Sequence, residues 1–158
     1  MIPLQHARAH ARAFEDLIVS TRPQWAITLT WKPARRSQFR DDLDVERAVR
    51  KGMCVLARAL GGQGWQDLYP PTIAYIGVLE NGVGGDVHVH LAVRVNPGLS
   101  AWGRSRFTGW WMRNHGFAHF KKVFGARGLA KYMSKHFGPR SHYILSKDLT
   151  SFDDDDFG

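Results

Sequence analysis

Apolar residues recur along this chain with two periods, one typical of β-strands and one typical of amphipathic helices. Runs rich in β-branched and aromatic residues, bounded by turn residues, predict strands at about residues 24–31, 72–80, 86–95 and 117–124. Apolar positions at helical spacing predict helices at about residues 4–19, 42–60 and 99–114, and a further helix between Gly125 and Gly138. Strands and helices therefore alternate over most of the chain.

The order of these elements predicts the fold. It reads β-α-β-β-α-β followed by one more helix, which is the split βαβ pattern. We expect an α+β fold with an antiparallel sheet of four to five strands, ferredoxin-like or similar to an RNA-recognition motif. The helices at 42–60 and 99–114 should share one face of the sheet, because the connections that contain them are of crossover length. The last helix can then pack across the other face.

The length of 158 residues fits one domain with its own core. We divide the chain into an N-terminal helix or arm (1–20), a main domain (21–147) and a tail (148–158). Five acidic residues crowd this tail, so we expect it to be disordered. The tail could also link the domain to a further one.

Charge is distributed unevenly. The chain has 22 Lys and Arg against 14 Asp and Glu, but residues 1–147 hold all 22 basic and only nine acidic residues, a formal charge of +13. Such a field attracts phosphate backbones, although DNA, RNA and an anionic membrane would all respond to it. The candidate phosphate contacts are Arg35, Arg36, Arg40, Arg104, Arg106, Arg113 and Lys131. Most aromatic residues are expected in the core, and the others could stack on unpaired bases.

Cys54 is the only cysteine, which excludes an internal disulfide and a thiolate metal cluster. It lies within a helical apolar pattern, so we expect it in the core. No apolar run approaches the length of a membrane span, and the N-terminus lacks the apolar stretch of a signal peptide. We therefore expect an intracellular, cytoplasmic protein without a membrane partner.

Two histidines in the third predicted strand form a candidate metal site. Side chains alternate faces along a strand, so His88 and His90 should point the same way, about 7 Å apart. If the glycine-rich turn at 81–86 centres near Gly84, Glu80 lies directly across from His88. Two imidazoles and one carboxylate would then converge, as in metal sites. A sheet face that carries two structural histidines is the alternative.

The last predicted helix carries a tyrosine and a lysine one turn apart. Tyr132 and Lys135 are at positions i and i+3, so they share a helix face. Taken alone, a packing tyrosine and an exposed lysine would explain them. His119 and His136 could also approach this region, although we expect a packing or solvated role for His119 and a helix-capping role for His136.

Three motifs together point to a known family. Ile27-Thr-Leu-Thr30, His88-Val-His90 and Tyr132-Met-Ser-Lys135 each occur once, in this order. In these motifs, over about residues 24–140, the chain resembles the HUH endonuclease superfamily, in particular the single-tyrosine rolling-circle replication initiators (Rep) of plasmids, phages and single-stranded DNA viruses.

The resemblance implies a metal-dependent nicking and joining enzyme. Glu80, His88 and His90 would hold Mn²⁺ or Mg²⁺, although Zn²⁺ also suits these donors. Tyr132, assisted by Lys135, would attack single-stranded DNA, leaving a 5′-phosphotyrosine and a free 3′-hydroxyl that can later be rejoined. The expected partners are an origin hairpin or nonanucleotide nick site, and a helicase and polymerase of a bacterial or archaeal host or of the replicon.

Two other functions stay open. A single-tyrosine HUH transposase has a similar motif order, but its tyrosine helix commonly carries Gln where this chain carries Lys135. A non-catalytic RNA-recognition-like module has the same sheet. Such a module would carry stacking aromatic residues on its strands and would have no use for Glu80, His88 and His90 together.

Overall fold

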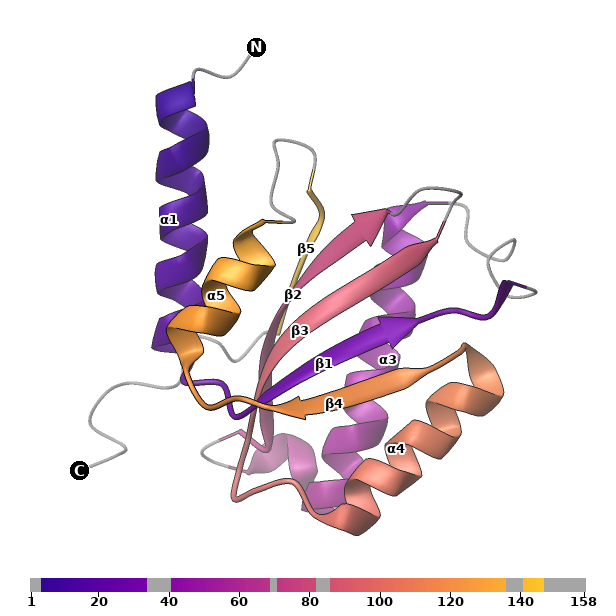
Figure 1. Cartoon of the computed structure of the whole chain (residues 1–158). Helices are drawn as coiled ribbons and strands as arrows, with labels where there is room; N and C mark the ends of the chain where they lie inside the picture. The colour runs from indigo at the N-terminus through magenta and orange to yellow at the C-terminus, as the bar shows by residue number, and fades with distance from the viewer. Residues whose placement is uncertain (1–3, 34–40, 69–70, 82–85, 136–140, 147–158) are drawn as a thin grey trace.

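Five strands form one antiparallel sheet in the order β4-β1-β3-β2-β5. The computed structural model describes residues 4–33, 41–68, 71–81, 86–135 and 141–146 (Figure 1). Its elements are α1 (Leu4–Ser20), β1 (Trp25–Thr30), α3 (Asp42–Gly61), η1 (Trp65–Asp67), β2 (Ile73–Asn81), β3 (Val87–Val95), α4 (Ala101–Asn114), β4 (Ala118–Lys122), α5 (Ala126–Ser134) and β5 (Tyr143–Leu145). The predicted α+β class and the split βαβ order are confirmed.

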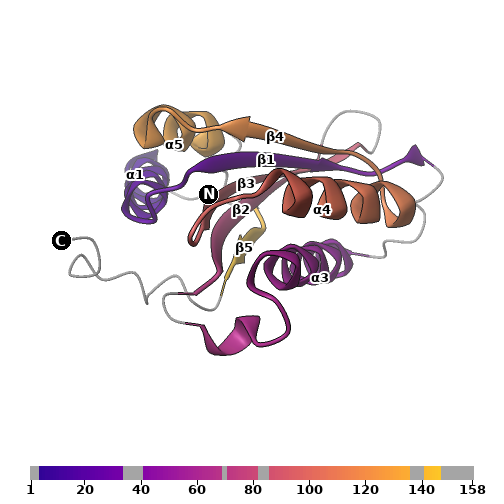
Figure 2. The same ribbon diagram turned by 90° about the horizontal axis from the view of Figure 1, so that it is seen from below.

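Helices α3 and α4 lie together on one face of the sheet, as predicted (Figure 2). Asp41 caps α3 by accepting a hydrogen bond from the backbone N–H of Asp44, and Ser100 caps α4 in the same way from Gly103. The larger core lies beneath these helices. Its largest members include Leu29, Met53, Leu56, Leu91, Phe107 and Trp111.

Helices α1 and α5 pack on the opposite face, against the middle of β2 and β3 (Figure 2). A second apolar cluster holds them there: Phe14, Ile18, Ile76, Val78, Ala92, Ala130 and Met133. The Ser134 hydroxyl of α5 also donates a hydrogen bond to the Glu15 carboxylate of α1, at 2.9 Å. The predicted placement of the last helix across the second face is therefore correct, and α1 shares that face.

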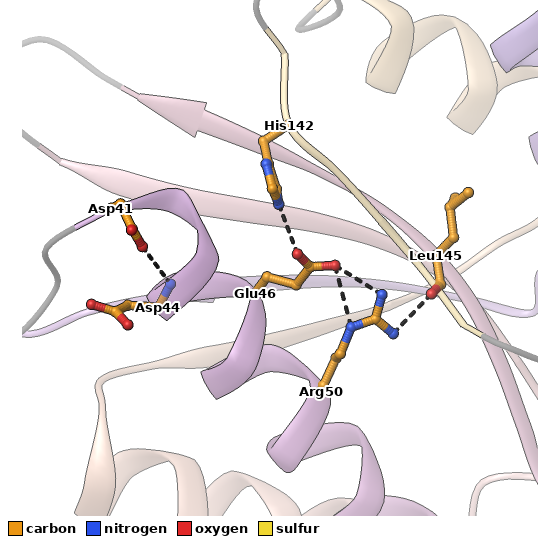
Figure 3. Close-up of polar contacts among 6 residues, drawn as sticks. All are labelled: Asp41, Asp44, Glu46, Arg50, His142 and Leu145. Carbon is orange, nitrogen blue, oxygen red and sulfur yellow. Dashed lines mark hydrogen bonds and ion pairs between the residues drawn. The ribbon is translucent and has the colours of Figure 1, made fainter.

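The edge strand β5 was not predicted as a separate element. Arg50 on α3 donates a hydrogen bond to the backbone carbonyl of Leu145 at 2.9 Å, and His142 bonds the Glu46 carboxylate at 3.0 Å (Figure 3). Burial alone would favour the neutral form of Glu46, but its bonds to Arg50 and His142 hold the pKa of its carboxyl below the usual value. This ionic cluster ties β5 to α3.

The prediction that Cys54 lies in the core is wrong, because its side chain is exposed. The buried stripe of α3 runs through Val45, Val49, Met53 and Leu56, and Cys54 lies beside it. Within the described residues, no helix is long and apolar enough to span a membrane. The division into 1–20, 21–147 and 148–158 stays a prediction, and the tail after Lys147 lies outside the described residues.

Candidate active site

The hairpin of β2 and β3 brings three metal-ligating side chains together. Glu80 pairs directly with His88, in the predicted register, and His90 follows two residues later on the same face of β3. The imidazole centroids of His88 and His90 are 6.4 Å apart. The predicted convergence of Glu80, His88 and His90 is therefore present, although the central turn residues 82–85 lie outside the described part of the chain.

The donor atoms of these residues lie close together. One ligand atom from each of Glu80, His88 and His90 lies within 4.8 Å of the other two. His90 Nε2 and Glu80 Oε2 are 2.7 Å apart, close to the roughly 3 Å between neighbouring donors whose metal bonds are about 2.1 Å long. His90 exposes only 8% of its side chain, whereas Glu80 exposes 32%. These residues can thus hold a divalent cation that stays accessible from one side.

Tyr132 lies beside this site. Ala130 and Met133 are buried in the second apolar cluster, which fixes the rotation of α5 about its axis. Tyr132 then lies on the side of the helix toward β3. The Tyr132 ring meets the His90 ring edge to face, with centroids 5.6 Å apart and an interplanar angle of 87°. Tyr132 is nevertheless 49% exposed, so about half of this residue is open to solvent.

The basic residues predicted to assist Tyr132 or to contact DNA lie on both sides of the sheet. Lys135 is the exposed C-cap of α5, one turn beyond Tyr132, and Lys131 is exposed in the last turn of the same helix. Arg113 lies near the end of α4, in the layer on the other side of the sheet, so the structure does not bring it to Tyr132. The side chains of Arg104 and Arg106, also on α4, lie over the rings of Trp25 and Trp102.

Four residues singled out in the sequence lie outside the described part of the chain. Arg35, Arg36 and Arg40 fall within residues 34–40, and His136 falls within 136–140.

The sequence did not assign a site role to His119. In the sheet, Thr28 of β1 pairs with His90 on one side and with His119 of β4 on the other. Residues that pair directly across neighbouring strands point to the same face of the sheet, so these three side chains form a row. The row runs from His90, in the candidate metal site, toward the edge strand β4. His119 and His90 both line a cavity of about 540 Å³ beside Tyr132. The sequence pattern that could have pointed to this row is the Ile27-Thr-Leu-Thr30 strand, because alternation along it places Thr28 and Thr30 on the same face of the sheet.

Comparison with protein families gave a match over residues 24–137, to the family of the replication-associated protein ORF2. The matched segment is more than half of the 158 residues and contains the histidine hairpin and Tyr132. The chain belongs to this family. Membership of this replication-associated family links the protein to DNA replication and so to DNA as a partner. Comparisons with curated proteins and with solved structures found no match.

Proposed function

We propose that this protein is a replication initiator of the HUH endonuclease type, which nicks single-stranded DNA at an origin and can rejoin it. The observation that carries the proposal is the contact of the Tyr132 ring with His90, one of three convergent metal-ligating residues. A nucleophile and a site for a phosphate-binding cation are thereby adjacent. Membership of a replication-associated family supports the same role.

Glu80, His88 and His90 would hold the divalent cation, Mn²⁺ or Mg²⁺. When bound, the cation supplies a Lewis acid that offsets negative charge on the oxygens of the scissile phosphate. The Glu80 carboxylate and the His90 imidazole already lie within hydrogen-bond distance, which holds the two side chains together where a cation would bind. No thiolate lies among these donors, so the set does not favour a soft cation, and its two imidazoles also suit Zn²⁺.

The covalent step belongs to Tyr132. Its hydroxyl oxygen attacks phosphorus in line with the 3′-oxygen, so that the Tyr132 O–P bond forms as the P–O3′ bond breaks. The phenol proton passes to solvent, and the departing 3′-oxygen takes one up. Lys135, one helical turn away, contributes positive charge where negative charge develops. Because the phosphodiester is exchanged and not hydrolysed, a 3′-hydroxyl can later reverse the step.

The same face of the sheet disfavours a purely binding function. A non-catalytic RNA-recognition-like module stacks bases on aromatic side chains of its central strands. Here the corresponding row carries Thr28, His90 and His119.

Exposed Lys131 and Lys135 are suited to the DNA backbone near the nick, while Arg113, in the other layer, would contact DNA farther away. A helicase of the host or replicon would then unwind the duplex, and a polymerase would extend the released 3′ end.

The proposal is tested by trapping a covalent product. A labelled pool of random single-stranded oligonucleotides is incubated with the protein and Mn²⁺ and resolved under denaturing conditions. The wild type should form a protein–DNA adduct, and Tyr132→Phe should form none while still binding the pool. Tyr143→Phe is the matched control, because that tyrosine packs against Phe14 and is not among the metal-ligating residues. An adduct that survives in Tyr132→Phe would contradict the proposal.

A further inference from the structure

The cavity beside Tyr132 has a mostly apolar wall on one side and polar side chains on the other. It lies between α5 and the sheet, and its volume of about 540 Å³ falls in the range of small-molecule sites. Helix α5 lines it with Leu129, Tyr132 and Met133. The sheet contributes the polar row of Thr28, His90 and His119 on the other side. A mostly apolar wall facing a few polar side chains suits a ring with hydrogen-bonding groups along one edge.

One of the residues that line this cavity, Phe124, has a highly exposed aromatic side chain. Phe124, between β4 and α5, is 92% exposed, more than any other large apolar side chain in the described part of the chain. Burying a phenylalanine is strongly favourable, so a ring left this open is a ready surface for stacking. The Lys122 ammonium lies 5.9 Å from the centroid of this ring.

The charge of the cavity selects an anionic ligand. Lys121 lines it on the same face of β4 as His119, and no carboxylate is among the described residues that line the cavity. Flat apolar surface, hydrogen-bonding groups and positive charge are the three features that an unpaired nucleotide requires.

We infer that this cavity binds the base of an unpaired nucleotide next to the scissile phosphate. The base stacks on Phe124, its polar edge faces Thr28 and His119, and its phosphate lies against Lys121. This inference rests on the proposed function, because Tyr132 is part of the same cavity wall. It makes Phe124 a residue that positions the strand and contributes to nucleotide preference, not one that takes part in bond breaking.

The test separates base binding from phosphate binding. Two labelled probes of equal charge are compared by fluorescence anisotropy without added metal: a 12-residue oligothymidylate and a 12-residue abasic phosphodiester. The wild type should bind the probe with bases at least about tenfold more tightly, the effect expected from stacking of a base. Phe124→Ala should lose most of this preference. Lys121→Ala should weaken both probes by a similar factor, because both carry the same phosphates.

Phe117→Ala is the matched control. Phe117 is also an exposed phenylalanine, at 61%, and it too has a lysine ammonium, that of Lys32, 5.9 Å from its ring centroid. It does not line the cavity, so this variant should keep the wild-type preference. The inference is overturned if Phe124→Ala keeps the full preference, or if Phe117→Ala loses as much of it. Because both rings are exposed, unchanged melting temperatures will verify that the variants fold.

Failure of the inference is distinguishable from failure of the proposed function. If adduct formation requires Tyr132 but Phe124→Ala leaves base preference intact, the base site is wrong and the nicking chemistry stands. If Phe124→Ala removes base preference but Tyr132→Phe still forms the adduct, the base site stands and the assigned nucleophile is wrong.

Discussion

Addition of Mn²⁺ should stabilise the protein through Glu80, His88 and His90, and removal of one ligand should abolish most of that gain. A cation present at 100 times its dissociation constant adds about 2.7 kcal/mol to the free energy of unfolding. For a chain of this length, 1 kcal/mol corresponds to about 2–4 °C in melting temperature. The wild type should therefore melt about 5–11 °C higher with Mn²⁺ than with a chelator.

The structure predicts a second effect for Glu80→Ala, independent of metal. This substitution removes the 2.7 Å hydrogen bond to His90, whose side chain is only 8% exposed. A buried polar group left without its partner costs about 1–3 kcal/mol. In chelator, Glu80→Ala should therefore melt several degrees below the wild type. His88→Ala removes a ligand but leaves that bond intact, so its main effect should be on the response to Mn²⁺.

Differential scanning calorimetry of the wild type and variants, in chelator and across a Mn²⁺ titration, measures both effects. His119→Ala is the matched control, because His119 lies on the same face but outside the three-residue donor set. Its response to Mn²⁺ should equal that of the wild type. The metal assignment fails if Mn²⁺ raises the melting temperature of Glu80→Ala and His88→Ala as much as that of the wild type.

Two other predictions concern the parts that support the site. Met133→Ala should lower the free energy of unfolding in urea by about 2–5 kcal/mol and slow adduct formation, because Met133 is wholly buried where α5 meets the sheet; unchanged stability would refute the packing of α5. The pKa of Glu46 is lowered in the folded protein, so its bonds to Arg50 and His142 stabilise the fold at pH values above 4.5, the ordinary pKa of a Glu carboxyl. This contribution to the free energy of unfolding is lost as the pH falls through the folded-state pKa of Glu46. Between about pH 5 and 3 the wild type should therefore lose more stability than Glu46→Gln, and parallel losses would contradict the role of that cluster.

Local pattern was sufficient for the central hairpin. The strands at 72–80 and 86–95 are joined by a short glycine-rich connection, so the register of Glu80 with His88 depends on few residues. The sequence also placed the last helix across the second face, and in the structure Ala130 and Met133 form its buried side, with Tyr132 beside them. Contacts close in sequence thus located Glu80, His88, His90 and the tyrosine helix.

Features that depend on distant contacts could not be predicted. Strand β5 has only three residues and is held by Arg50 and by the pairing of His142 with Glu46, 96 positions earlier. The site position of His119 depends on the register of β4 against β1, and a shift of one residue would turn its side chain to the other face. Cys54 was wrongly predicted in the core because helical periodicity identifies the apolar stripe of a helix but does not fix where the stripe ends.

Mass spectrometry of the trapped product tests the central claim most directly. The wild-type adduct formed with single-stranded DNA and Mn²⁺ is digested with nuclease and trypsin, and the modified peptide is sequenced. We predict a nucleotide phosphate on Tyr132, in the peptide released by cleavage after Lys131 and Lys135. Attachment to any other residue, or cleavage of DNA by the wild type with no adduct at all, would contradict the assignment of Tyr132 as the nucleophile.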